Sequence, residues 1–253
     1  MIITRESLAD YLYRYLVCDE FSDYAPNGIQ VEGCSDIRRI CTAVTASESV
    51  IQEAIAMKAD ALLVHHGYFW RGESSVIVGM KRRRIALLLA VNMSLFAYHL
   101  PLDAHPLIGN NAYLGQLFGV GSVLSHTIGS TPRLLWSGTL DTPMTAEDFG
   151  VLIATQLGRL PLHVAGSNKL IHRIAWCSGG AQDYIENAHQ LGVDAYISGE
   201  ISERTYYQAK ELGLHYFAAG HHATERGGIR ALGDHLGMQF QLEHQFIDSD
   251  NPV

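Results

Sequence analysis

Residues 37–67 read IRRICTAVTASESVIQEAIAMKADALLVHHG and contain the pattern that decides the fold. The stretch opens with a strand-like segment, RRICTAV, and closes with the continuous apolar run ALLV, which is typical of a buried strand. Between them, apolar residues recur at the i, i+3, i+4 spacing of an amphipathic helix. The order strand, helix, strand predicts a βαβ unit with parallel strands and a right-handed crossover.

The same pattern recurs at residues 171–201, which align with residues 37–67 without gaps. Seven of the 31 positions are identical, where composition alone would give about two. Both copies continue with a predicted helix and a further strand. We therefore expect an α/β fold of two related three-layer α/β/α domains, residues 1–127 and 128–253, with a metal cleft between them. A terminal strand could still cross to the other sheet and shift this boundary.

Side chains that are able to bind metals stand at the ends of the predicted strands. They are His65 and His66, His99 and Asp103, Glu200, and a pair formed by Glu225 with either His221 or His222. Adjacent strand residues point to opposite faces, so the two neighbouring histidines converge only if the chain leaves strand geometry, which Gly67 permits. The alternative is one buried and one exposed histidine. Ligands gather at strand carboxyl ends in open α/β sheets, and five ligands exceed one tetrahedral site, which predicts two metals.

Each of the other polar residues near these strand ends has two possible roles. His99 could move protons or hold Asp103 in orientation, or it could be purely structural. Glu200 is a candidate general base, or it orients a ligand. His222 is a candidate site residue, or an outer residue facing solvent. Ser178-Gly179-Gly180 could present backbone N–H groups to an anion, or it is only a tight turn.

Two further segments also have alternative interpretations. Tyr68, Phe69 and Trp70 could stack on a substrate base, or they pack in the core or at a subunit interface. The basic run Lys81-Arg82-Arg83-Arg84 could meet phosphates, or it is a solvated helix face.

Composition narrows the function classes. The formal net charge of −8 and the pI of about 5.9 argue against broad electrostatic binding to nucleic acid or to a membrane. The four cysteines form no close cluster, so a disulfide framework or a zinc ribbon is not indicated. The N-terminal residues lack the apolar run of a signal peptide, and we expect a cytoplasmic protein.

Four segments, SDYAPNGIQVEG, VHHGYFWRGE, YHLPLDAHPLIGNNAYLG and AAGHHATERGG, resemble the motifs of a dinuclear-metal family. This is the family of GTP cyclohydrolase one type two homologues, also called the Nif-three-like family. The resemblance implies two divalent ions per chain, either zinc, iron or manganese, and a toroidal homohexamer built as a trimer of dimers. It assigns the metal ligands to His65, His66, Asp103, His221 and Glu225, and it favours His221 over His222 because His221 directly follows glycine.

Three functions are compatible with these observations. The first is a dinuclear metal-dependent hydrolase acting on a nucleotide or related heterocycle, which the resemblance favours. The second is a non-catalytic, metal-binding ring that binds protein partners. The third is a factor that processes damaged nucleotides or single-stranded nucleic acid.

Overall fold

The computed structural model describes residues 2–253 and divides the chain into two compact units. Unit 1 contains Met1–Leu102 and Gly228–Asp250, and unit 2 contains Asp103–Gly227 and Asn251–Val253. The units therefore divide at Leu102, earlier than the boundary expected at residue 127. The reason is a hairpin of β7 (Val120–Ile128) and β8 (Thr131–Met144) that joins the second sheet, because β8 pairs with β10 (Ile171–Trp176).

Unit 1 is built on a five-stranded sheet in the order β13-β4-β5-β6-β2. Its four parallel strands are β13 (Glu243–Phe246), β4 (Arg39–Thr45), β5 (Ala61–His66) and β6 (Ser94–Ala97). The antiparallel edge strand is β2 (Gly28–Val31). The last strand of the chain, β13, thus belongs to the first sheet. A separate two-stranded pair is formed by β1 (Ile3–Thr4) and β3 (Asp36–Ile37).

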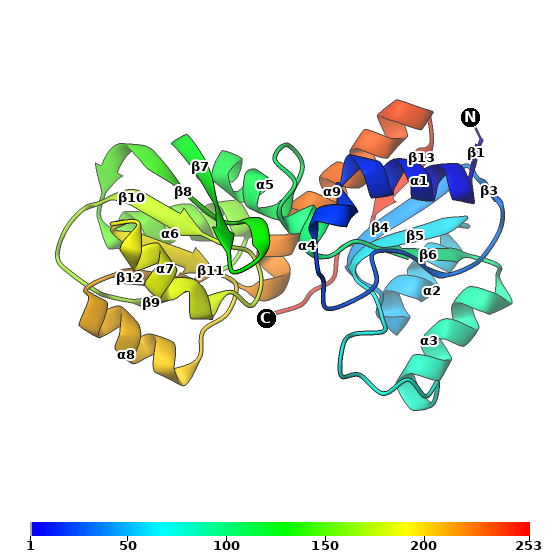
Figure 1. Ribbon diagram of the computed structural model, residues 1–253, viewed down its shortest axis with the longest axis horizontal. Coiled ribbons are helices and arrows are strands. Elements are labelled where there is room, and N and C mark those ends of the chain that lie inside the picture. The colour runs from blue at the N-terminus through cyan, green and yellow to red at the C-terminus, as the bar shows by residue number, and fades with distance from the viewer. Residues whose placement is uncertain (1) are drawn as a thin grey trace. The chain divides into compact units, whose positions relative to one another are not determined.

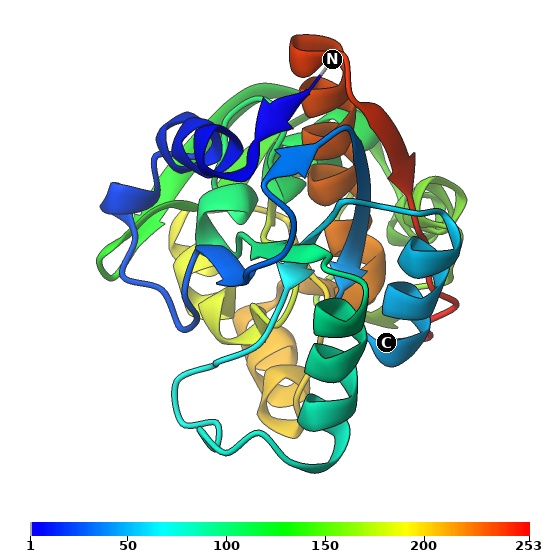
Figure 2. The same ribbon diagram turned by 90° about the vertical axis from the view of Figure 1, so that its right-hand side faces the viewer.

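Helices cover both faces of the unit 1 sheet (Figures 1 and 2). One face carries α2 (Glu48–Ala56) and α3 (Gly79–Ala90), whose apolar side chains pack on Leu62 and Val64 of β5. The other face carries α1 (Arg5–Tyr15) and the end of α9 (His221–Phe240), which meet where Tyr11 contacts His235. Unit 1 is therefore a three-layer α/β/α structure.

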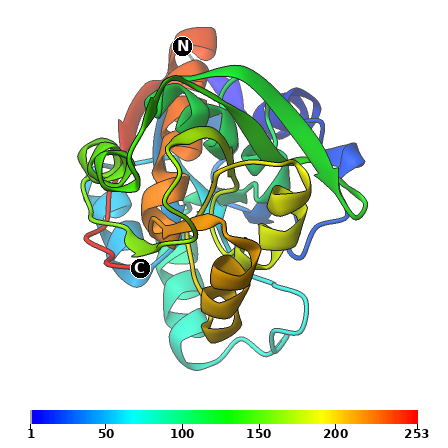
Figure 3. The same cartoon turned by 90° about the vertical axis from the view of Figure 1, so that its left-hand side faces the viewer.

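Unit 2 has a six-stranded sheet in the order β7-β8-β10-β11-β12-β9. Its parallel centre is β10, β11 (Ala195–Ser198) and β12 (His215–Ala218), and β9 (Leu162–Val164) is the antiparallel edge. The helices are α5 (Asn110–Leu117), α6 (Ala146–Leu157), α7 (Ile185–Gln190) and α8 (Glu203–Leu212) (Figure 3). The short segments of the chain are η1 (Cys18–Glu20), α4 (Leu100–Asp103) and η2 (Gln182–Tyr184).

Local sequence signals explain where two of these helices begin and end. Thr145 caps α6, because its side-chain oxygen accepts from the backbone N–H of Asp148, as the Thr-x-x-Asp spacing predicts. Gly213 ends α8 in the left-handed conformation, with a φ of 65°, which glycine adopts without steric cost. No helix within residues 2–253 is long and apolar enough to span a bilayer.

Each unit contains the same aspartate contact, at positions that correspond in the sequence repeat. Asp60 Oδ2 accepts hydrogen bonds from the backbone N–H groups of Arg38 and Arg39, at 2.8 and 2.9 Å. Its counterpart Asp194 accepts from the backbone N–H groups of residues 172 and 173, at 3.0 and 2.8 Å. In both units this aspartate lies between the helix and the second strand of the βαβ unit, and it ties the second strand to the first. The predicted α/β fold is confirmed, and its layout is consistent with an internal duplication.

Candidate metal-binding residues

Three histidines gather at the strand ends of unit 1. His65 and His66 close β5, and His99 follows β6. Each offers one ring nitrogen, and these nitrogens lie within 4.8 Å of one another. The neighbouring histidines therefore converge, as expected, although β5 continues through His66 without the predicted turn. Gly67 is needed for space instead, because a Cβ there would lie 2.8 Å from the Cβ of Ala97 and 2.1 Å from Gln30 Oε1.

The Nδ1 atoms of these histidines are held by protein oxygens. His65 Nδ1 donates to the carbonyl oxygen of Tyr98 at 3.0 Å, and His99 Nδ1 donates to Asp23 Oδ1 at 2.7 Å. His66 Nδ1 lies 3.3 Å from the hydroxyl oxygen of Thr45. A carbonyl or a carboxylate can only accept, so the Nδ1 atoms of His65 and His99 carry the proton. In neutral imidazoles this leaves the lone pair on Nε2, which is the usual arrangement of metal-binding histidines.

Asp23 is a site residue that the sequence analysis missed. Its Oδ2 accepts from Asn27 Nδ2 and from the backbone N–H of Leu100, both at 2.9 Å. Burial raises the pKa of Asp23, but hydrogen bonds from His99, Asn27 and the Tyr24 backbone outweigh this, and the pKa falls below its usual value. Asp23 is therefore an ionised, buried carboxylate that fixes the ring of His99. Its position in SDYAPNGIQVEG was the only signal for it.

The aromatic residues after the histidines have different roles. Tyr68 is buried, and its hydroxyl donates to the carbonyl oxygen of Ala46, so Tyr68 packs in the core, which was one of its two predicted roles. Phe69 packs against the apolar core and lies under the Lys81 ammonium, with Nζ 4.7 Å from the ring centroid. Trp70 is the one that borders the histidines, since its ring lies 4.9 Å from that of His99.

Two residues of the basic run 81–84, Lys81 and Arg83, pair with glutamates within unit 1. Lys81 is 9% exposed, and its Nζ donates to the carbonyl oxygen of Ser74 and lies 3.3 Å from a Glu73 carboxylate oxygen. Arg83 pairs with Glu48 at 3.1 Å. Lys81 is thus not part of a solvated face, whereas Arg82 and Arg83 are exposed, as expected for a solvated helix face.

Asp103 lies in unit 2 and is held by buried donors. Its Oδ1 accepts from Asn110 Nδ2 and from the hydroxyl of Ser178, both at 2.8 Å. Ser178 is itself fixed, because its backbone N–H donates to Asn111 Oδ1 at 2.9 Å. The Ser-Gly-Gly segment is therefore more than a turn, since it orients a candidate metal ligand. Asn110 and Ser178 were not predicted in this role.

The first turn of α9 supplies the remaining candidate ligands. His221 Nδ1 donates to Glu200 Oε1 at 2.6 Å, and His221 Nε2 lies 3.1 Å from Glu225 Oε1. Burial lowers the pKa of His221, but the carboxylates of Glu225 and Glu200 outweigh it and raise the pKa to about 9. These carboxylates favour a positive charge at Nε2. Gly179 has a φ of +66°, and a Cβ there would lie 2.3 Å from Glu225 Oε1, so this position favours glycine.

The two remaining candidates of unit 2 can now be placed. Glu200 orients His221, which is one of its two predicted roles. His222 is buried, so it does not face solvent, and its backbone N–H donates to the carbonyl oxygen of Val253 at 2.9 Å.

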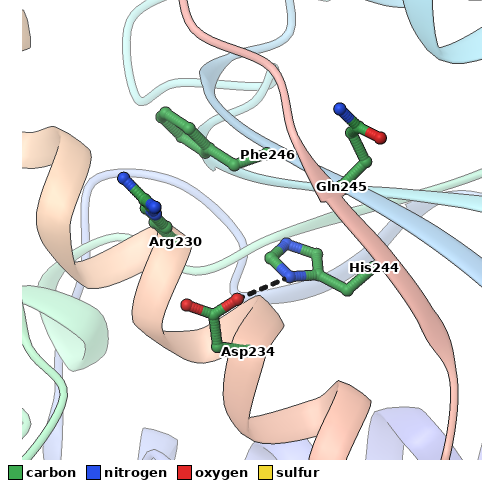
Figure 4. Close-up of a pocket in the computed structure, with 5 residues that line it drawn as sticks. All are labelled: Arg230, Asp234, His244, Gln245 and Phe246. Carbon is green, nitrogen blue, oxygen red and sulfur yellow. Dashed lines mark hydrogen bonds and ion pairs between the residues drawn. The ribbon is translucent and has the colours of Figure 1, made fainter.

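A histidine elsewhere in unit 1 shows what a structural histidine looks like (Figure 4). His244 on β13 donates from Nδ1 to Asp234 Oδ1 at 2.9 Å, beside a cavity of about 400 Å³. Its Nε2 is also occupied, since it lies 2.8 Å from Thr42 Oγ1. The order Asp, His, Thr is that of a hydrolytic triad, but Thr42 is fully buried and its hydroxyl is out of a substrate's reach. This cluster ties β13 and α9 to β4.

Known proteins resemble the chain over its whole length. The family described as Duf34/NIF3 (NGG1p interacting factor 3) matches residues 3–252. A protein of Pseudomonas aeruginosa named GTP cyclohydrolase 1 type 2 homolog is 48% identical over 253 residues, covering 100% of both chains. Its namesake in Escherichia coli K12 is 50% identical over 233 residues, or 92% of each chain.

A solved structure described as protein ybgI of unknown function is also similar. It superimposes with a TM-score of 0.95 at 46% identity, over 99% of this chain and 100% of that chain. These findings confirm the resemblance drawn from the four sequence motifs. The chain belongs to the Duf34/NIF3 family.

Proposed function

We propose that this protein is a metal-dependent hydrolase that uses two divalent ions per chain to act on a nucleotide or related heterocycle. The ligand residues in this proposal are His65, His66, Asp103, His221 and Glu225, with His99 as an additional candidate. Each unit supplies part of this set.

The orientation of the histidines carries the proposal. In His65, His99 and His221 a protein oxygen accepts the Nδ1 proton, and two of these oxygens are carboxylates. Such acceptors fix the ring, raise the basicity of the other nitrogen and characterise metal-binding histidines. The Nε2 atom of His221 faces a second candidate ligand, Glu225 Oε1, at 3.1 Å, whereas the Nε2 atom of the structural His244 faces the hydroxyl oxygen of Thr42. Imidazole and carboxylate together suit zinc, iron and manganese.

The chain's own groups would hold the metal ligands in place and orient the substrate. Divalent ions supply a Lewis acid and make water acidic enough to react near neutral pH. Asn110 and Ser178 hold Asp103 in place through Oδ1, and Glu200 holds His221. Trp70 presents an aromatic ring beside His99, against which a flat heterocycle could stack.

The name of the relatives supports cyclohydrolase-like chemistry for this site. Lys81 and Arg83 each pair with a glutamate of the same unit, and the net charge of the chain is −8, so a nucleic-acid factor is the less favoured alternative. A cytoplasmic homohexamer remains part of the proposal and is tested by sedimentation of the purified protein.

The test is a hydrolysis screen with the metal-loaded protein over nucleotides, modified bases and phosphoesters. We expect turnover of at least one nucleotide-related compound, with loss of that turnover in Asp103→Asn. A metal-loaded protein without activity on any of them, but with a captured protein partner, would favour the non-catalytic ring instead.

A further inference from the structure

A cavity of about 480 Å³ opens in unit 2 where β11 and β12 end. Gly199 and Glu200 directly follow β11, and Gly220 comes two residues after β12. Small molecules bind at the carboxyl ends of parallel strands in open α/β sheets, in pockets of roughly 300–1,000 Å³. The position and the size of this cavity are therefore those of a small-molecule site.

Arg159 supplies the positive charge of this cavity. Its Nη1 donates to the carbonyl oxygen of Pro252 at 2.7 Å, which fixes the guanidinium. The side chain passes directly over Gly220, where a Cβ would lie 2.3 Å from Nη1 and where φ is +101°. Within residues 2–253 the guanidinium has no carboxylate partner. Several of its N–H donors are therefore available to a ligand.

Glu200 connects the cavity to a candidate metal ligand. The same side chain lines the cavity and accepts the Nδ1 proton of His221. A molecule bound in the cavity would thus lie against the residue that orients His221. The other walls include apolar side chains, among them Ile201 and Pro252.

We propose that this cavity is the substrate pocket of the hydrolase and that Arg159 recognises an anionic group of the substrate, a phosphate or a carboxylate. This inference rests on the proposed function and specifies its substrate class. A guanidinium pairs with oxyanions through two parallel N–H donors. The Glu200 carboxylate repels a second anion, so the anionic group lies on the Arg159 side. The uncharged part of the substrate packs on Ile201 and Pro252.

The test uses isothermal titration calorimetry on the purified, metal-containing protein. Three probes share a phenyl ring and differ in charge group: phenyl phosphate, phenylacetate and benzyl alcohol. We expect an anionic probe to bind, and Arg159→Gln to weaken it at least tenfold with unchanged metal content. The matched control is Arg204→Gln, because Arg204 is an exposed arginine of the same unit that pairs with Asp183. The control should bind the probes as the wild type does.

Several results would overturn the inference. The first is failure of both anionic probes to bind the wild type, and the second is equal affinity of the probes for the wild type and Arg159→Gln. The third is loss of probe binding in His65→Ala, because that result would assign the anion to the metal ions. The tighter of the two anionic probes distinguishes a phosphate from a carboxylate. Arg159-dependent binding by a protein without metal would reject the proposed hydrolase while leaving the anion pocket standing.

Discussion

The two copies of the repeat keep one scaffold and carry different chemistry at their strand ends. Asp60 ties β5 to β4 in the first copy, and Asp194 ties β11 to β10 in the second, through the same pair of backbone N–H groups. At the following strand ends, His65 and His66 of the first copy correspond to Gly199 and Glu200 of the second.

This difference separates stability from function. The repeat-matched aspartates satisfy backbone groups, which any copy of the fold requires. The strand ends are free to vary, and unit 1 uses them for candidate ligands. Unit 2 uses the end of β11 to orient a ligand that α9 supplies, since Glu200 holds His221. Changes at the aspartates should therefore affect unfolding, and changes at the strand ends should affect metal binding.

The largest effect is expected from Asp103→Asn. Two nearby divalent cations repel strongly, and an anionic ligand between them reduces that repulsion. The variant keeps a similar shape but removes the charge, so it should lose at least one metal per chain and all hydrolytic activity, with an unchanged circular dichroism spectrum. Calorimetric titration with zinc measures the sites. His222→Ala, beside a proposed ligand, should keep both metals, and two tight sites in Asp103→Asn would contradict the need for the Asp103 charge.

A smaller effect on metal binding is expected from the residues that hold Asp103. Ser178→Ala and Asn110→Ala each remove one buried donor to Oδ1, which should weaken metal binding about 10–100-fold. Competition with a chelating dye measures this affinity. The control is Ser137→Ala, whose hydroxyl contacts His126 at 2.8 Å in the same unit. Equal metal affinity in Ser178→Ala and Ser137→Ala would remove Ser178 from the site.

The scaffold is tested by Asp60→Ala and Asp194→Ala. Each variant leaves two backbone N–H groups without their acceptor, which should lower the free energy of unfolding by about 1–3 kcal/mol. Urea denaturation measures both, and the two losses should be similar because the contacts are equivalent. Metal content should remain unchanged. A large loss of metal in either variant would show that the scaffold and the ligand set are not separable.

Much of the fold follows from short-range patterns in the sequence. Strand, helix and strand within residues 37–67 specify the βαβ unit, and the recurrence at 171–201 specifies the second one. The division between the two units could not be predicted in the same way. It was expected near residue 127 but follows Leu102, because β8 pairs with β10, and the chain returns to unit 1 because β13 pairs with β4. β13 is separated from β4 by about two hundred residues of chain.

The candidate site was predictable only where its residues are adjacent or fall in a family motif. His65 and His66 are neighbours, and His221 and Glu225 share one helical turn. The contact between Asp23 and His99 joins residues 76 positions apart, and that between Ser178 and Asp103 joins residues 75 apart. No local spacing encodes such pairs. The distinction between buried Tyr68 and Trp70 beside His99 likewise depends on the path of the chain after β5.

The smallest effect concerns pH and a histidine outside the candidate ligands. Burial lowers the pKa of His215 below 6.5, so the unfolded chain binds a proton there at a higher pH than the folded chain. The free energy of unfolding therefore falls as pH drops below about 6.5. Urea denaturation of His215→Asn at about pH 7.5 and pH 5.5 should show a smaller decrease than the wild type. An equal or larger decrease would contradict this assignment.

The most direct test of the account is the metal content of the purified protein. Elemental analysis of protein prepared without chelator should find close to two transition-metal ions per chain. His65→Ala and Glu225→Ala, one from each unit, should each lose metal while keeping the wild-type circular dichroism spectrum. Background metal in the wild type after reconstitution with zinc, manganese and iron, or full occupancy in both variants, would contradict the proposed centre.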